Sequence, residues 1–379
     1  MHPHRRVVRT IHHDVNEKPF LVIWEVTRAC QLVCKHCRAE AQHRPDPREL
    51  GFDEGRALLD QLASYDHPRP MLVLTGGDCF ERPDLVDLVR YGTEQGLHIS
   101  ISPSVTPLFT REKLTALRAA GGKAMSVSLD GARPATHDNF RGFPGTFERT
   151  VEATKMIREE GFRLQINTTL TRANIGEAPQ MLANAIEMGA FMWYIFLLVP
   201  TGRGAQLEAL SADEREDVLH WLHDVSDRIA IKTTEAPQYR RIALQRQRGQ
   251  CPVSARGALY FQLRAATALL LGDRPVNPRV PRPPLAINSG SGFAFISHIG
   301  DVYPSGFLPI KVGNIREQPF ATIYRESPVM RELRQPEGFG GNCGICEFKT
   351  ICGGSRSTAY ALSGDYRAAD PSCAYHPAS

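Results

Sequence analysis

Three cysteines lie within eight residues near the start of the chain. The stretch TRACQLVCKHC places Cys30, Cys34 and Cys37 in a C-x3-C-x2-C spacing. A four-iron cluster usually takes four cysteine ligands, so three would leave one iron open to a substrate or a cofactor. The alternative is a zinc site that takes its fourth ligand from His36 or from a distant cysteine.

A second group of cysteines lies near the other end of the chain. Cys343, Cys346 and Cys352 follow a C-x2-C-x5-C spacing, and Cys373 lies further along. Clustered cysteines of this kind indicate metal binding. The spacing also permits a structural zinc ion with four cysteine ligands.

Length and composition limit the class of protein. A chain of 379 residues that is 42% hydrophobic can form one large domain and a smaller one. Its net charge of +4 is too small to indicate a nucleic-acid partner. The sequence shows neither an apolar run long enough to span a membrane nor a signal peptide. We therefore expect a cytoplasmic protein without disulfides, in which Cys79 is a small buried residue and Cys251 a free thiol.

The cysteines must be positioned by a regular fold, and the chain shows one. Short apolar segments alternate with amphipathic helical segments. The expected strands span 20–27, 71–77, 98–104, 124–130, 163–170 and 191–200. The expected helices span 53–65, 83–96, 111–120, 146–160, 177–188 and 211–228. This α/β pattern predicts a parallel sheet curled into a partial (β/α)6 TIM-like barrel. The first cysteine group follows the first strand, at the edge where such folds place active sites.

Changes in composition divide the chain into four expected parts. Residues 1–19 form an N-terminal arm, and residues 20–230 form the barrel. Residues 231–289 are rich in Arg and Pro and read as a connecting insertion. Residues 290–379 begin with an expected hairpin and contain the second cysteine group, which predicts a small Cys-rich α+β domain.

The C-x3-C-x2-C motif after the first strand resembles that of the radical S-adenosylmethionine (SAM) enzymes. The resemblance implies a [4Fe–4S] cluster on the three cysteines, with SAM on its open iron. His36 stands where that family has an aromatic residue, and Cys79 replaces the family's usual proline. The expected SAM-contacting positions follow successive strands and include His36, Gly76, Gly77, Asp78, Ser128, Asp130, Asn167 and Val199.

The C-terminal region resembles the SPASM/twitch domain of many radical SAM enzymes. The full SPASM pattern has seven cysteines, which hold two auxiliary [4Fe–4S] clusters. Here serine stands in three of those places, at Ser305, at Ser355, and at Ser289 or Ser291. All of these losses fall on one cluster. The resemblance therefore implies a single auxiliary [4Fe–4S] cluster, held by the four cysteines of the tail.

Longer stretches, including SVSLDGARPATHDNFRGFPGTF and AYALSGDYRAADPSC, resemble the enzymes of alternative haem biosynthesis. Those enzymes oxidise propionate side chains of iron porphyrins, with loss of CO2. The resemblance implies cleavage of SAM to a 5′-deoxyadenosyl radical, a small carboxylated substrate and a flavodoxin- or ferredoxin-type reductant. Peptide maturases share the scaffold and remain an alternative, as does a non-enzymatic iron–sulfur scaffold.

Arginines are the expected partners of substrate carboxylates, because their planar groups bind both oxygens at once. Arg141 and Arg203 follow strands at the barrel's active-site end and are the first candidates. Arg240 and Arg241 belong to an Arg-rich stretch of the insertion. They could also pair with substrate, or they could form a solvated helix face.

Overall fold

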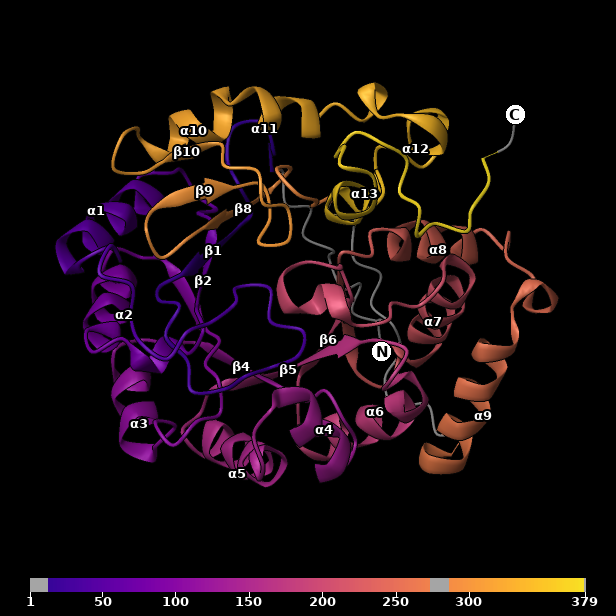
Figure 1. The fold of residues 1–379 in the computed structure, drawn as a ribbon, viewed down its shortest axis with the longest axis horizontal. Coiled ribbons are helices and arrows are strands. Elements are labelled where there is room, and N and C mark those ends of the chain that lie inside the picture. Colours follow the sequence, from indigo (N-terminus) through magenta and orange to yellow (C-terminus); the bar gives the residue numbers. More distant parts are fainter. Residues whose placement is uncertain (1–12, 273–285, 378–379) are drawn as a thin grey trace, which may run out of the picture.

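The computed structural model describes residues 13–272 and 286–377. Its centre is a ten-stranded sheet in the order β10-β9-β8-β1-β2-β3-β4-β5-β6-β7. Helices surround the strands, so that the sheet forms an open barrel (Figure 1). The expected arm at 1–19 lies mostly outside the described residues, as does part of the expected insertion.

Six strands form the parallel centre of the sheet, each paired with the next along the chain. They are β1 (Leu21–Glu25), β2 (Met71–Thr75), β3 (His98–Ile101), β4 (Ala124–Ser128), β5 (Arg163–Leu170) and β6 (Met192–Leu197). This confirms the predicted partial barrel. Buried and partly exposed side chains alternate along β5 and β6, so one face packs under the helices while the other faces inward.

The outer helices agree with the predicted positions. They are α1 (Phe52–Ala63), α2 (Leu85–Glu94), α3 (Arg111–Ala119), α5 (Thr146–Glu159), α6 (Ala178–Glu187) and α7 (Ala212–Val225). On α1, the buried residues include Leu58, Leu59 and Leu62, which form the predicted apolar face. The sequence analysis missed α4 (Pro134–Arg141), because its eight residues show no clear apolar period.

The sheet continues beyond the six predicted strands at both edges. β7 (Ala230–Thr234) pairs parallel with β6, and β8 (Phe293–Ile296) pairs parallel with β1. Two short antiparallel strands, β9 (Asp301–Tyr303) and β10 (Gly313–Asn314), then follow β8. The C-terminal region is thus joined to the barrel by hydrogen-bonded strands, and the domain boundaries remain predictions.

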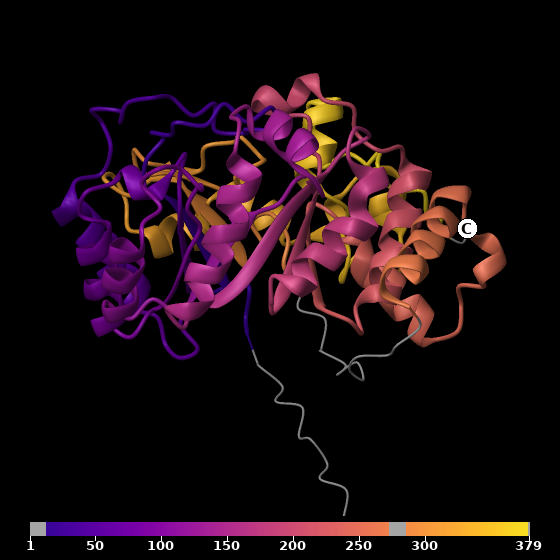
Figure 2. The ribbon, with the colours of Figure 1, turned by 90° about the horizontal axis from the view of Figure 1, so that it is seen from below.

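The remaining helices lie in the insertion and in the tail. They are α8 (Gln238–Gln247), α9 (Ala258–Leu271), α10 (Phe320–Glu326), α11 (Pro328–Leu333), α12 (Gly341–Ile345) and α13 (Arg356–Ser363). Short 3-10 turns are η1 (Cys79–Glu81), η2 (Ile175–Glu177), η3 (Gly202–Gln206), η4 (Val253–Ala255) and η5 (Pro336–Gly338). The yellow tail lies beside α8 in Figure 1, and Figure 2 shows it near the same helices from below. None of the helices in the described part of the chain could cross a membrane.

Candidate active site

The first cysteine group lies on the loop that follows β1. Cys30 and Cys34 are buried together with Leu32, and Cys37 and Phe143 pack against them in a small cluster apart from the main core. Burial raises the pKa of the Cys30 thiol to about 11. Three thiols gathered at a largely buried site suit a metal cluster, which binds them as thiolates and displaces their protons.

Two distant segments hold this cysteine loop by its backbone. The Arg203 backbone N–H donates to the Cys37 carbonyl at 3.1 Å, and its side-chain Nε donates to the Cys34 carbonyl at 2.9 Å. The Lys35 N–H donates to the Phe140 carbonyl at 2.9 Å. The turn η3 after β6 and the helix α4 after β4 therefore position the loop.

His36 lies among these contacts and packs against an aromatic neighbour. It stacks on Phe140, with ring centroids 4.6 Å apart and planes inclined by 26°. Burial lowers the pKa of His36 to about 4, so the ring is neutral near pH 7. The position that is aromatic in the family motif is therefore filled by an aromatic, uncharged ring.

Gly76 and Gly77 bring the end of β2 against the cysteine loop. A Cβ at Gly77 would lie 2.5 Å from the Ala29 carbonyl oxygen and 2.6 Å from that of Arg28. The Gly77 N–H also donates to the Thr27 carbonyl at 2.9 Å. The close approach that these glycines allow is to the cysteine loop itself.

We expect Gly77→Ala to destabilise the protein by about 1–3 kcal/mol, the usual cost of overpacking a tight contact. The backbone oxygens that the new methyl group meets cannot move without shifting the cysteine loop. Gly176→Ala is the matched control, because a Cβ at Gly176 meets no atom within 4 Å. Chemical denaturation of both variants measures the difference. Equal stabilities would contradict the packing described for Gly77.

Asp78 joins the segments that follow β2 and β3 by hydrogen bonds beside Cys30. Its Oδ1 accepts from the N–H groups of Phe80 at 3.0 Å and Ser104 at 3.2 Å, and its Oδ2 accepts from Thr106 Oγ1 at 2.7 Å. Burial raises the pKa of Asp78 to about 6. Its carboxylate thus has three internal partners, and the expected contact with the SAM amino group stays a prediction. Cys79, the next residue, is fully buried.

Ser128, the last residue of β4, is paired in register with Asn167, which lies within β5. Both are partly exposed, and Asn167 Oδ1 accepts from Gln165 Nε2 at 2.7 Å. By contrast, Val199 is buried, and its carbonyl accepts from the Thr201 N–H at 2.8 Å. Ser128 and Asn167 are therefore the more accessible of these predicted SAM contacts.

Asp130 and Arg141 form a buried ion pair behind the cysteine loop. Arg141 Nη2 lies 2.5 Å from Asp130 Oδ2, and Arg141 Nη1 donates to Cys34 Sγ at 3.6 Å. Burial would raise the pKa of Asp130, but Arg141 holds it below its usual value. Arg141 is thus engaged with Cys34. Arg203 differs, because its Nη2 is buried without a hydrogen-bond partner among the described residues.

The tail cysteines form the second candidate metal site. Cys343 and Cys352 are buried, while Cys346 and Cys373 are partly exposed. The Cys343 sulfur accepts from Arg356 Nη2 and from the Asp370 N–H, both at 3.3 Å. Donors aimed at sulfur are typical of iron–sulfur ligands, because they stabilise the anionic cluster. The donor set therefore fits a cluster.

Two of the serines that replace cysteines bond to one carboxylate, that of the partly buried Glu235. Ser305 Oγ donates to Glu235 Oε1 at 3.0 Å, and Ser355 Oγ donates to Glu235 Oε2 at 2.6 Å. Ser289 Oγ lies 3.4 Å from Ser357 Oγ. Burial raises the pKa of Glu235, which directly follows β7 and has a left-handed φ of 55°. The sequence analysis missed this group, because Glu235 belongs to no motif.

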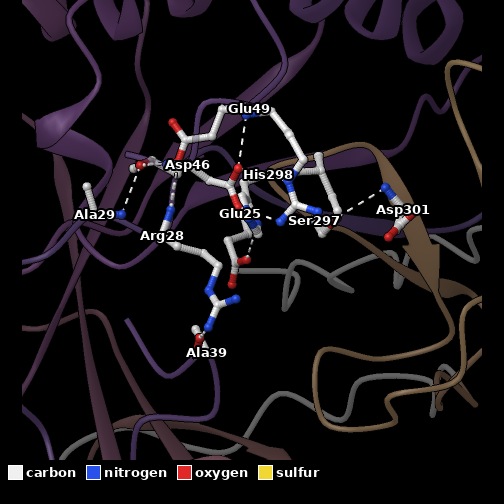
Figure 3. Close-up of polar contacts among 12 residues, drawn as sticks. Glu25, Arg28, Ala29, Ala39, Asp46, Glu49, Ser297, His298 and Asp301 are labelled. Atoms are coloured by element: carbon white, nitrogen blue, oxygen red, sulfur yellow. Dashed lines mark hydrogen bonds and ion pairs between the residues drawn. The ribbon is translucent and has the colours of Figure 1, made fainter. Parts of the chain in front are cut away.

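A further polar group joins the cysteine loop to the C-terminal region. Glu25, at the end of β1, faces His298, which follows β8 (Figure 3). His298 Nδ1 lies 3.1 Å from Glu25 Oε1, and Arg38 Nη2 donates to Glu25 Oε2 at 2.9 Å. Since Arg38 directly follows Cys37, this group ties the end of the loop to β8.

Within residues 13–272 and 286–377, no group of three or more His, Cys, Asp or Glu side chains is arranged to hold a single metal ion. A four-iron cluster makes a different demand, because each cysteine binds a different iron atom.

Comparison with known proteins connects these sites to a family. The Radical SAM superfamily profile matches residues 24–185, and the SPASM profile, an iron-sulfur cluster-binding domain, matches residues 288–347. The chain is 41% identical to an AdoMet-dependent heme synthase of Methanosarcina barkeri, over 95% of this chain and 97% of that protein. It is 40% identical to an AdoMet-dependent heme synthase of Nitratidesulfovibrio vulgaris, over 99% and 97%.

Among solved structures, SuiB of Streptococcus suis bound to the precursor peptide SuiA has a TM-score of 0.68 at 14% identity. The likeness covers 95% of this chain and 76% of SuiB, and it shows the fold alone. The sequence relationships go further, because they extend over nearly the whole of both chains. They imply [4Fe–4S] clusters and SAM as cofactors. The chain is an enzyme of the radical SAM superfamily with a C-terminal SPASM domain.

Proposed function

We propose that this enzyme uses SAM to oxidise propionate side chains of an iron porphyrin, with loss of CO2, in haem biosynthesis. The name and near full-length similarity of the heme synthases support the substrate class. The structural observation that carries the proposal is the position of both cysteine groups. The first group follows β1. The second group adjoins Glu235 and α8, and both of these follow β7. Both cysteine groups therefore lie toward the C-terminal edge of one sheet.

The residues of the first group divide into two roles in this proposal. Cys30, Cys34 and Cys37 hold a [4Fe–4S] cluster, and the chemistry that this cluster and SAM supply is a 5′-deoxyadenosyl radical that removes hydrogen from an unactivated carbon. The remaining predicted residues contact SAM or position the loop, and these are His36, Gly76, Gly77, Asp78, Ser128, Asp130, Asn167 and Val199.

A flat, carboxylated substrate has suitable partners on the inner face of the barrel. Tyr194 and Phe196 alternate along β6, both partly exposed, with ring centroids 4.8 Å apart. The ring centroids of Phe307 and Phe196 lie 6.3 Å apart, and Lys232 Nζ lies 4.8 Å from the centroid of the Tyr194 ring. Aromatic rings beside a cation suit a flat anionic macrocycle. We keep Arg203 as the proposed carboxylate contact. We propose Arg141 instead as the residue that positions Cys34.

The proposed reaction needs an acceptor for one electron. Loss of a hydrogen atom, CO2 and one electron turns a propionate side chain into a vinyl group. The tail cysteines are the second place in the described chain where a redox cluster fits, and we propose this cluster as the acceptor. A flavodoxin- or ferredoxin-type protein would supply the first electron. A cytoplasmic location follows from this proposal, since reduced thiols persist there.

We further propose that the tail holds one auxiliary [4Fe–4S] cluster, on Cys343, Cys346, Cys352 and Cys373. The support is the group around Glu235, because two serines at expected cysteine positions donate to the same carboxylate. A serine hydroxyl is a poor iron ligand beside a thiolate. Ser305 and Ser355 thus stabilise the Glu235 carboxyl group at positions where a second auxiliary cluster would need cysteine thiolates.

The function is tested by incubating the anaerobically reconstituted enzyme with SAM, dithionite and iron coproporphyrin. We expect a porphyrin product in which propionates have become vinyl groups, with one 5′-deoxyadenosine formed per side chain. The same porphyrin with esterified propionates is the control and should give no such product. If a co-expressed short peptide is modified and the porphyrin is not, the enzyme is a peptide maturase instead.

A further inference from the structure

Three arginines surround the tail cysteine site. Arg356 is fully buried at the start of α13, and its Nη2 donates to Cys343 Sγ at 3.3 Å. Arg240, on α8, donates from Nε to the carbonyl of Ile351, the residue before Cys352, at 2.5 Å. Arg241 is buried beside it and affects the thiols of Cys373 and Cys352 electrostatically. Arg240 and Arg241 therefore do not form the solvated helix face that the sequence allowed.

The arginines differ in how their charges are compensated. Arg241 pairs with Glu216 at 2.5 Å. For Arg356 and Arg240, no carboxylate oxygen in the described part of the chain lies within 4.0 Å of their nitrogens. The other hydrogen bonds of Arg356 go to backbone carbonyls of Tyr366 and Ala368.

Arg240 retains one free donor. Its Nη1 donates to the Ile287 carbonyl at 2.8 Å, but its Nη2 is buried without a hydrogen-bond partner among the described residues. This guanidinium interacts electrostatically with Cys352 and Tyr194. Arg240 thus lies between a proposed cluster ligand and the inner face of β6.

Besides Glu216 and Glu235, two further carboxylates belong to this neighbourhood. Asp370 is buried, and it accepts hydrogen bonds from Gln238 Nε2 and the Ser355 N–H, both at 2.7 Å. Glu347, beside Cys346, is exposed to solvent and bonded to Tyr375. Neither is an ion-pair partner of Arg240 or Arg356. Glu347 also has a side-chain hydrogen bond with Cys346, whereas the contacts to the Cys343 sulfur are made by Arg356 and by the Asp370 N–H.

The three-cysteine site is arranged differently. There the arginine that donates to a cysteine sulfur, Arg141, is paired with Asp130 at 2.5 Å. Its charge is largely neutralised by that carboxylate. An uncompensated cation beside a cluster favours the reduced form, which carries one more negative charge, and hydrogen bonds to sulfur act in the same direction.

We propose that Arg240 and Arg356 raise the reduction potential of the tail cluster and thereby fit it to accept the electron from the substrate. This inference rests on the proposed function, because it requires a [4Fe–4S] cluster on the tail cysteines. The substrate radical is oxidised by one electron as CO2 leaves, and the cluster is reduced by one electron. An oxidised flavodoxin- or ferredoxin-type protein then takes that electron away.

The test measures the potential of the tail cluster alone. In the full-length chain, Cys30, Cys34 and Cys37 are changed to Ala, and the reconstituted protein is titrated under redox control with EPR detection. Arg240→Gln should shift the reduction equilibrium at least tenfold toward the oxidised cluster, which is about 59 mV for one electron. Arg240→Lys, which keeps the charge, should shift it less.

Arg248→Gln is the matched control, because Arg248 lies exposed at the end of the same helix. Its potential should equal that of the unsubstituted protein. The same titration of Arg356→Lys and Arg356→Gln gives a second comparison should Arg240→Gln fail to fold. An unchanged potential in Gln variants that retain their iron would overturn the inference and leave the proposed function intact. A triple-Ala protein that holds no four-iron cluster would overturn both.

Discussion

Replacing Cys34 with Ala should abolish the release of 5′-deoxyadenosine from SAM. Cys34 is the central cysteine of the loop, and it is buried with its sulfur beside Arg141. Three thiolates already leave one iron without a cysteine ligand, so a loop with two cannot hold the cluster that SAM binds. Chromatography of the nucleosides formed with dithionite and SAM measures the loss.

Cys251→Ala is the control for this experiment. Cys251 is a partly exposed cysteine that lies far along the chain from the motif, with its sulfur 3.8 Å from Gln245 Oε1. The control should release 5′-deoxyadenosine like the unsubstituted enzyme. Radical chemistry at this loop would be refuted if Cys34→Ala formed the nucleoside at the same rate.

Replacing Cys346 with Ala should separate SAM cleavage from product formation. The change removes one ligand of the proposed tail cluster and leaves the loop after β1 untouched. We expect 5′-deoxyadenosine to form while the vinyl product falls to a small fraction of the unsubstituted yield. The physical reason is that the substrate radical keeps an electron for which the enzyme no longer offers an acceptor. Both products are measured in the same reaction.

Iron analysis makes the Cys346→Ala result interpretable. The unsubstituted protein should contain about eight irons, from two four-iron clusters, and a variant that has lost the tail cluster about four. A count near twelve would contradict the single auxiliary cluster, and stoichiometric zinc in the tail would favour a structural site. If the variant lacks the tail cluster and still makes product at the unsubstituted rate, that cluster only supports the fold.

The sequence predicted the central strands and helices, because they depend on local patterns, while the cysteine sites stay a prediction. Apolar segments alternating with helical ones are visible along the chain, and all six strands lie where expected. By contrast, the polar strand β7, with the sequence AIKTT, carries no apolar signal of its own. It is a strand because β6 offers it a parallel partner.

The contacts that the sequence could not predict join residues far apart in the chain. The structure shows that Arg203 Nε donates to the Cys34 carbonyl, a contact that the sequence did not predict, and its expected contact with substrate stays a prediction. The polar group around Glu235 could not be predicted, because Ser305 and Ser355 come from separate segments and meet at its two oxygens only in the folded chain. Such pairings follow from tertiary packing, and a single sequence contains no periodic signal for them.

The transfer of deuterium from a labelled substrate tests the central claim most directly. Loss of CO2 with formation of a double bond requires the hydrogen to leave the side-chain carbon that is attached to the macrocycle. Iron coproporphyrin deuterated at that carbon is incubated with the enzyme, SAM and dithionite, and the nucleoside is analysed by mass spectrometry. We predict one deuterium in the 5′-deoxyadenosine that accompanies each vinyl group. Unlabelled 5′-deoxyadenosine alongside unchanged porphyrin would contradict the proposed function.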